Sequence, residues 1–185
     1  MSLEGVQGLM EALAAKQSAI VREWLGRTLQ SYPEHTGRFL AQEQDPFRNP
    51  VGQTLRDALP AIFEQLVGDV DAAALRRLLD PIVRIRAVQD FSAGQAVAFL
   101  FLLKPVVREA LRPHIQAHPA GDALAILEGR IDQMALLAFD LFMQCRAQVY
   151  EIKANETRRR TEILLRRHDA LPRLSDSPIR ERETP

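Results

Sequence analysis

Apolar residues recur at spacings of three and four along most of the chain, which is the period of amphipathic helices. The first such pattern predicts one helix over residues 3–29, which Pro33 ends or redirects. Asn49 and Pro50 then supply a capping side chain and a first-turn proline, so a helix is predicted from there to near Gly68. No alternating strand pattern occurs, and the sequence therefore predicts an all-α fold.

Two further start signals divide the middle of the chain. Asp71 is a suitable cap for a helix that Asp80-Pro81 would bend or restart. Ser92 and Gln95 have the spacing of a capping box, in which each side chain accepts a hydrogen bond from the backbone amide of the other residue. The polar stretches around Asn49 and before Ser92 are therefore interpreted as structural hinges between helices.

A buried central helix is predicted next. The segment from Ala96 to Leu103 is apolar on almost all sides, which is typical of a helix enclosed by others. Pro105 is expected to kink this helix, and Pro113 is expected to end it near His114.

The longest helical pattern begins after Pro119-Ala120-Gly121 and meets no proline before Pro172. Its near-heptad apolar stripe consists of Leu124, Leu127, Ile131, Met134, Ala138, Leu141, Cys145, Val149 and Ile152. Residues 149–165 exceed the length that a compact domain covers, so this part should form a homodimer, dock onto a signalling partner or fray as a monomer. The polar sequence beyond Leu171-Pro172 predicts a disordered tail.

Charge and cysteine content narrow the possible partners and the cellular compartment of the protein. The formal net charge of zero leaves no overall field that would attract nucleic acid or an anionic membrane. Cys145 is the single cysteine, which excludes an internal disulfide framework and fits a reducing compartment. The N-terminus lacks the regions of a secretory signal, and the apolar run that Lys104 closes is too short to span a membrane. These features favour a cytoplasmic protein.

Four segments of the chain carry a resemblance to a known family. They are residues 20–25 with Tyr32-Pro33, the hinge at 45–52, the stretch 85–92 running into 95–99, and residues 138–156. In this order and spacing, the chain resembles the RsbRD N-terminal domain family, which comprises helical sensor domains of bacterial stressosome co-antagonists and of other signalling proteins. The resemblance implies a single helical domain, a globin-like bundle without haem, with a long C-terminal helix.

The resemblance also implies how the chain is divided. Residues 1–155 would form the sensor domain, and residues 156–185 would form a basic helical stem and the tail. Since no output domain follows the stem in this sequence, the signal is expected to pass to a separate partner protein. A small ligand between helices would be the input, and no cofactor is expected.

Histidines are the candidate metal or haem ligands of this sequence. His114 and His118 have the spacing that places two ligands on one helical face. Pro113 and Pro119 flank the pair and no Glu or Cys stands nearby, so no metal is expected and a helix end or loop is favoured. The globin-like resemblance leaves haem as the alternative, with His114 as the first axial candidate.

Three basic residues are the candidate ligand-binding residues: Arg84, Arg86 and Lys104, which flank the second hinge and the central helix. A buried cation needs a partner, and Asp90 or Asp140 would supply a structural ion pair. In the functional alternative, the cations hold an anion or carboxylate ligand between helices.

The remaining reactive or charged features have structural explanations. Cys145 lies on the apolar stripe, which predicts a buried and inert thiol. The runs Arg158–Arg160 and Arg166-Arg167 lack interleaved aromatic residues and a helix-turn-helix, so a solvated stem or docking segment is favoured over a nucleic-acid site. Salt-dependent nucleic-acid binding that is lost when Arg158–Arg160 are neutralised would indicate the opposite.

The sequence contains no arrangement of residues that is typical of an enzyme. The sequence has no glycine-rich phosphate loop, no Gly-x-Ser-x-Gly and no Cys-x-x-Cys, so no catalytic residue is assigned. The predicted function is that of a non-enzymatic sensory or regulatory protein. It would bind a signalling partner or a second copy of itself, together with a small ligand, and signal through its long C-terminal helix. A haem or gas sensor, recognisable by its colour, is the alternative.

Overall fold

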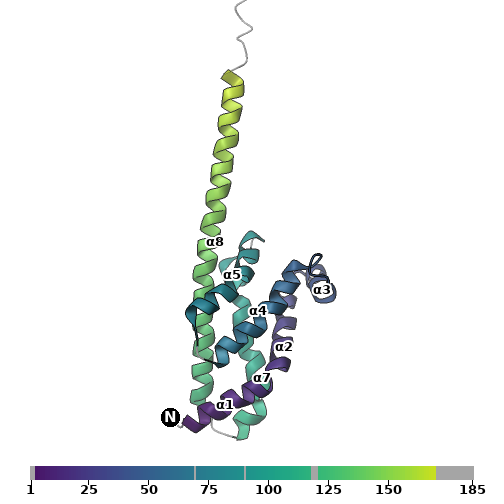
Figure 1. Cartoon of the computed structure of the whole chain (residues 1–185), viewed down its shortest axis with the longest axis vertical. Helices are drawn as coiled ribbons and strands as arrows, with labels where there is room; N and C mark the ends of the chain where they lie inside the picture. The colour runs from purple at the N-terminus through teal and green to yellow at the C-terminus, as the bar shows by residue number, and fades with distance from the viewer. Residues whose placement is uncertain (1–2, 69, 90, 118–120, 170–185) are drawn as a thin grey trace, which may run out of the picture. The chain divides into compact units, whose positions relative to one another are not determined.

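The structure is all-α, as predicted. The computed structural model describes residues 3–68, 70–89, 91–117 and 121–169, which contain no strand (Figure 1). The helices are α1 (Leu3–Ala15), α2 (Gln17–Gln30), α3 (Glu34–Gln42), α4 (Pro50–Val67), α5 (Ala72–Val88), α6 (Ala93–Phe101), α7 (Leu103–Ala117) and α8 (Gly121–Asp169). Across the described ranges, none of these helices combines the length and the apolar character needed to cross a membrane.

The chain divides into two compact units, Met1–Ala147 and Gln148–Pro185, and α8 contributes residues to both. The first unit is a helical domain with the hydrophobic core. Of the second unit, the structure describes residues 148–169, which are helical throughout. The predicted boundary at residue 155 stays a prediction, and the predicted disordered tail lies outside the described residues.

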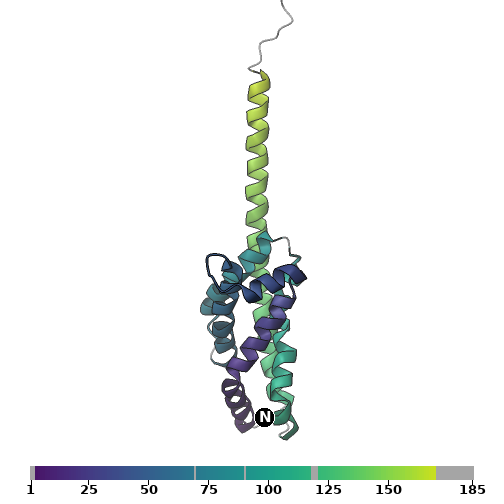
Figure 2. The same cartoon turned by 90° about the vertical axis from the view of Figure 1, so that its right-hand side faces the viewer.

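The core of the first unit lies where α2, α4, α5, α6 and α7 pack on one another. Helix α4 contacts both α2 and α5, and α7 contacts α1, α2 and α6. Figures 1 and 2 show these neighbours from two sides. Trp24, Phe63 and Phe99 are fully buried here, so α6 does supply the core as predicted. Phe101 at the end of α6 is nevertheless 43% exposed, so the predicted central segment is not enclosed on all sides.

The prediction of one helix over residues 3–29 is wrong, because the helix is interrupted at Lys16. The backbone of Lys16 departs from helical values, with φ −107° and ψ 6°. Its Nζ donates a 2.5 Å hydrogen bond to the carbonyl of Ala110 in α7. The interruption lets α1 pack on α7 and α4 while α2 packs on α3, α4, α6 and α7. Leu13 and Ile20 are buried on either side of it, which is why the apolar period does not reveal the break.

Prolines affect α5, α6 and α7 differently. The predicted kink near Pro105 is a short interruption at Leu102, because the proline ring would clash with the carbonyl of Phe101 in a continuous helix. Of the bend or restart predicted at Pro81, the restart is wrong, and the predicted end at Pro113 is also wrong. Helices α5 and α7 continue through these prolines, and each gives up one backbone hydrogen bond.

The predicted helix caps are confirmed. The side chains of Asn49 and Asp71 accept hydrogen bonds from backbone amides in the first turns of α4 and α5. Ser92 and Gln95 form the reciprocal capping box at the start of α6. Local hydrogen bonds therefore order both hinges.

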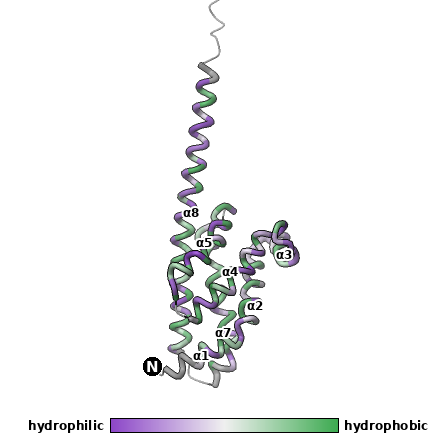
Figure 3. The backbone as a smooth tube through the Cα atoms, viewed as in Figure 1, coloured by the Kyte–Doolittle hydropathy of each residue, from purple (hydrophilic) through white to green (hydrophobic). Residues whose placement is uncertain are grey.

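Helix α8 buries its apolar stripe only within the first unit. Leu127, Ile131, Met134, Ala138, Leu141 and Cys145 are buried there, as the heptad-like spacing predicted. In the second unit, side chains from Gln148 to Arg166 are exposed, apart from a half-buried Val149. Figure 3 shows hydrophilic positions recurring along this part of α8. Val149 and Ile152 therefore belong to the sequence stripe but not to the core.

Candidate functional site

Arg86 lies in the last turn of α5 and is completely buried. Its Nη1 donates hydrogen bonds to the carbonyl oxygens of Gln95 and Ala96, at 3.1 and 3.2 Å. Both carbonyls belong to the first turn of α6. Arg86 therefore connects the end of α5 to the start of the helix that follows it.

Three aromatic rings surround the guanidinium. Its Cζ lies 4.8 Å from the ring centroid of Phe99, 5.2 Å from that of Phe91 and 5.4 Å from that of Tyr32. The rings of Tyr32 and Phe91 meet edge to face, with centroids 5.4 Å apart. Because the faces of aromatic rings attract cations, this cage offsets part of the cost of burying the charge. We call Arg86 and these three aromatic residues the Arg86 site.

Two nitrogens of the Arg86 guanidinium are left over. Among the residues that the structure describes, Nε and Nη2 have no hydrogen-bond partner. Burial lowers the pKa of Arg86, and the nearby Tyr32 opposes that shift. Arginine keeps its proton all the same, so the site holds a buried positive charge. Asp90, one of the predicted partners, lies outside the described residues.

A pocket of about 430 Å³ opens beside the Arg86 site. It is lined by Ser31, Tyr32, Pro33, Gln89, Phe91 and Gln95. Tyr32, Phe91 and Gln95 also contact the Arg86 guanidinium, through their rings or through a backbone carbonyl. We call this cavity the Tyr32–Phe91 pocket. It shares Tyr32, Phe91 and Gln95 with the surroundings of the buried cation.

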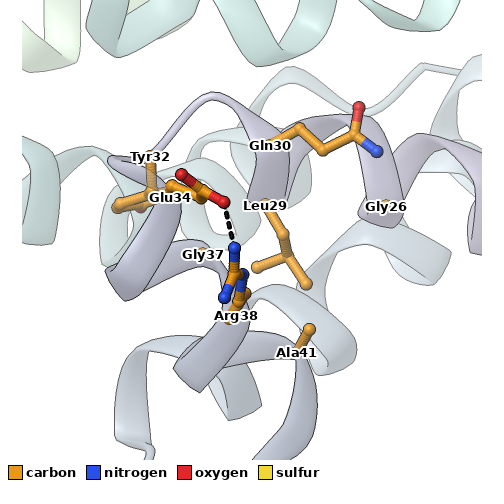
Figure 4. Close-up of a pocket in the computed structure, with 8 residues that line it drawn as sticks. All are labelled: Gly26, Leu29, Gln30, Tyr32, Glu34, Gly37, Arg38 and Ala41. Carbon is orange, nitrogen blue, oxygen red and sulfur yellow. Dashed lines mark hydrogen bonds and ion pairs between the residues drawn. The ribbon is translucent and has the colours of Figure 1, made fainter.

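A second cavity, of about 450 Å³, lies between α2 and α3 and shares Tyr32 with the first. Figure 4 shows its lining, which consists of Gly26, Leu29, Gln30, Tyr32, Glu34, Gly37, Arg38 and Ala41. The helices approach so closely here that a Cβ on Gly37 would lie 2.7 Å from the carbonyl oxygen of Leu29. The cation of this cavity, Arg38, is exposed and already paired with Glu34. It is therefore the weaker candidate for an anion site.

The other two candidate cations have carboxylate partners of their own. Arg84 pairs with Asp80 one turn earlier in α5, at 2.7 Å, and Lys104 in α7 pairs with Asp132 in α8, at 2.6 Å. The partner proposed from the sequence, Asp140, is exposed. Helical spacing and the packing of α7 beside α8 select the observed partners instead. The structure therefore places the three cations in three different environments.

Comparison with protein families identifies the domain that carries this site. Residues 18–157 match the family described as RsbT co-antagonist protein rsbRD N-terminal domain. The chain belongs to this family. The match confirms the resemblance drawn from the four sequence segments. Comparisons with curated proteins and with solved structures found no match, and the globin-like relation of this rsbRD N-terminal domain stays a prediction.

The histidines of the rsbRD N-terminal domain do not define a site. His114 lies in the last turn of α7, at a helix end as predicted, and neither its side chain nor His118 is among the features that the structure describes. Within the described ranges, no cluster of three or more His, Cys, Asp or Glu side chains is placed to hold a metal ion. Haem, with His114 as the first axial candidate, stays the untested alternative.

The thiol is buried as predicted, whereas the choice between a solvated stem and a nucleic-acid site for the basic runs stays a prediction. Cys145 is buried, and burial raises the pKa of its thiol, although the nearby Arg84 opposes the shift. A raised pKa means little thiolate at neutral pH and an unreactive group. Arg158–Arg160 are exposed in the second unit, and Arg160 pairs with Glu156 within the same helix at 2.5 Å.

Sequence reasoning identified Arg86 but missed the rings around it. Tyr32 lies in the α2–α3 turn, Phe91 precedes α6 and Phe99 lies inside α6, so no local spacing links them. The sequence nevertheless contained a feature that could have pointed to these rings. All three rings lie in the segments that carry the family resemblance, and the structure brings those segments together at Arg86.

Proposed function

We propose that this rsbRD N-terminal domain is a non-enzymatic regulatory protein that senses a small ligand at the Arg86 site. It passes the change through α8 to a partner, which is in the first instance a second copy of the chain. The regulatory character of the co-antagonist family supports this proposal. The contacts of α8 support the route and the partner.

The route from the Arg86 site to α8 is short. Ala87, the next residue after Arg86, presents its carbonyl oxygen to Nη1 of Arg146 in α8, at 3.0 Å. At the end of α5, Arg86 therefore belongs to the Arg86 site, and the next residue, Ala87, is bonded to α8. A ligand that moves this turn of α5 would also move its anchor on α8.

An exposed apolar face on α8 is the observation that carries the proposed partner contact. Within the first unit, Leu136, Phe139 and Met143 are 67%, 40% and 50% exposed. Their spacing of three and four places them on one face of the helix, apart from the buried stripe. Single exposed apolar residues are ordinary, but a contiguous apolar face marks an interaction surface.

The second unit, taken by itself, also fits a helix that needs a partner. Its exposed apolar residues are Tyr150, Ile152, Ile163, Leu164 and Leu165. A helix without tertiary packing is only marginally stable in water. Glu156 and Glu162 alternate here with arginines, so two such helices would offer each other opposite charges.

Sedimentation velocity of the full chain tests the proposed self-association with a matched pair of variants. Met143→Glu places a charge on the exposed apolar face and should convert a dimer to a monomer. Gln144→Glu makes the same change of charge at the next residue, which is also exposed, and should leave the dimer intact. Both variants should keep the helical circular-dichroism spectrum and thermal midpoint of the original chain.

Two outcomes would contradict the homodimer. One is an original chain that sediments as a monomer over the whole accessible concentration range. The other is a Met143→Glu variant that dimerises as strongly as the Gln144→Glu control.

A further inference from the structure

We propose that the Tyr32–Phe91 pocket binds a small aromatic monocarboxylate, whose carboxylate group is held by Nε and Nη2 of Arg86. This inference rests on the proposed function and names the chemical class of the ligand that the domain senses.

The first step is the arrangement of the donors on Arg86. Nη1 is occupied by the carbonyls of Gln95 and Ala96. The two nitrogens without a partner among the described residues, Nε and Nη2, lie along one edge of the planar guanidinium, with their hydrogens parallel. This edge is the fork that binds both oxygens of a carboxylate at once. The free donors thus have the geometry of a carboxylate site.

The second step is charge. A buried cation costs free energy unless an anion compensates it, and the rings and carbonyls around Arg86 supply only partial negative charge. Within the described part of the chain, which does not include Asp90, no ion pair to Arg86 is formed. The described residues that line the pocket are all uncharged. One anionic group on the ligand would therefore match the single cation, whereas a second would face no counter-charge.

The third step is the chemistry of the pocket wall. Tyr32, Pro33 and Phe91 present apolar surface, while Ser31 and Gln89 supply polar groups at the turns. Aromatic walls favour a flat apolar body, which stacks against them or meets them edge to face. A carboxylate on an aromatic ring combines this body with an anion for the Nε and Nη2 edge of Arg86.

The fourth step is access. Tyr32 and Phe91 contact each other and lie on both the pocket and the guanidinium, so they form the cover between the two. A ligand that reaches Arg86 must part these rings. Tyr32 follows α2 and Phe91 follows α5, so parting them moves the turns at which these helices end. Ligand entry is therefore coupled to the end of α5, which is anchored on α8.

Calorimetric titration of the full chain with benzoate tests the inference. Benzamide, which has the same ring and a neutral amide, is the control ligand. Benzoate should bind at least about tenfold more tightly than benzamide, since only benzoate neutralises Arg86. Arg86→Lys keeps the charge but removes the fork and should weaken benzoate binding by at least about tenfold. Arg84→Lys, at an exposed arginine of the same helix, should leave the affinity unchanged.

A second variant covers the case in which replacing Arg86 unfolds the domain. Gln89→Trp fills the pocket from an exposed position and leaves Arg86 in place, so it should abolish benzoate binding in a folded protein. The inference is overturned if benzoate does not bind the original chain, if benzamide binds equally well, or if Gln89→Trp binds benzoate normally. Unchanged affinity in a folded Arg86→Lys protein would also overturn it and leave Arg86 as a structural connector. The Met143→Glu variant should also be titrated with benzoate. Because the pocket should bind benzoate in a monomer as well, this titration tests ligand binding independently of the proposed dimer.

Discussion

Asn49 does more than cap α4. Its amide oxygen accepts a hydrogen bond from the backbone of Gly52, and its Nδ2 donates to the carbonyls of Leu40 and Glu43 at 2.9 and 2.8 Å. One buried side chain therefore joins the end of α3 to the start of α4. The absence of a side chain on Gly52 is part of this arrangement, because a Cβ there would lie 2.6 Å from the amide oxygen of Asn49.

Asn49→Ala should lower the free energy of unfolding by about 2 kcal/mol, because it removes the cap and two further hydrogen bonds in a buried place. Ser92→Ala removes an exposed cap and should cost about 1 kcal/mol or less. Urea unfolding followed by circular dichroism measures both changes. An Asn49→Ala protein as stable as the Ser92→Ala protein would show that the link to α3 contributes nothing.

At the scale of elements, α6 presents two different faces although its sequence is apolar almost throughout. Phe99 is fully buried and stacks on Trp24, with centroids 6.2 Å apart. The indole Nε1 of Trp24 donates to the carbonyl of Phe99 at 2.6 Å. Phe101 instead lies partly in solvent, with Nζ of Lys104 5.7 Å from its ring centroid. The same residue type therefore has two roles within one helix.

Phe99→Ala should lower the free energy of unfolding by about 3–5 kcal/mol, since it leaves a cavity between Trp24 and Arg86. Phe101→Ala makes the same chemical change at a partly exposed position of the same helix and should cost less than about 1 kcal/mol. Thermal and denaturant melts of the two variants supply the comparison. Similar losses in both would mean that α6 does not present Phe99 to the core.

The element boundaries show what a local pattern can and cannot reveal. Caps at Asn49, Asp71 and Ser92 were predictable because a cap is a contact between residues within one turn. The interruption at Lys16 was not, because the bond that accompanies it is made to Ala110 in another helix. Helices α5 and α7 also continue through Pro81 and Pro113, although each proline removes one backbone hydrogen bond.

At the scale of the whole molecule, the two units of the chain differ in what supports them. The first has its own core of buried apolar residues, whereas the described side chains of the second are almost all exposed. A version of the chain that ends at Glu151 should therefore keep its thermal midpoint, because it retains the core. It should also dimerise more weakly, because it lacks the exposed apolar residues of the second unit. Sedimentation and thermal melts of both versions measure the two effects.

Two results of that comparison bear on the role of α8. If both versions sediment as monomers and bind partners equally well, the second unit is not an interface. If the shortened version loses its thermal midpoint, residues beyond Glu151 belong to the folding unit, and the division at Ala147 does not describe its stability.

One part of the candidate site could be predicted from the sequence, and another part could be seen only in the structure. Arg86 could be named from the sequence because an arginine on an otherwise apolar helix face needs an explanation. Arg84 and Lys104 could not be told apart from it, because the difference lies in their partners. Asp80 and Asp132 neutralise those two cations, whereas Arg86 contacts carbonyls and rings.

The sequence by itself determined the helical class, the caps at the hinges, the long C-terminal helix and the family of this protein. These features depend on interactions within about four residues, or on an ordered set of segments along the chain. Only the tertiary structure decided where α1 ends, which face of α6 is buried and which cation has no carboxylate partner among the described residues. Those outcomes depend on contacts between residues far apart in sequence, such as Tyr32 and Arg86 or Lys16 and Ala110. Such contacts form only when the helices pack, and the period of a single helix carries no information about the side chains that meet it.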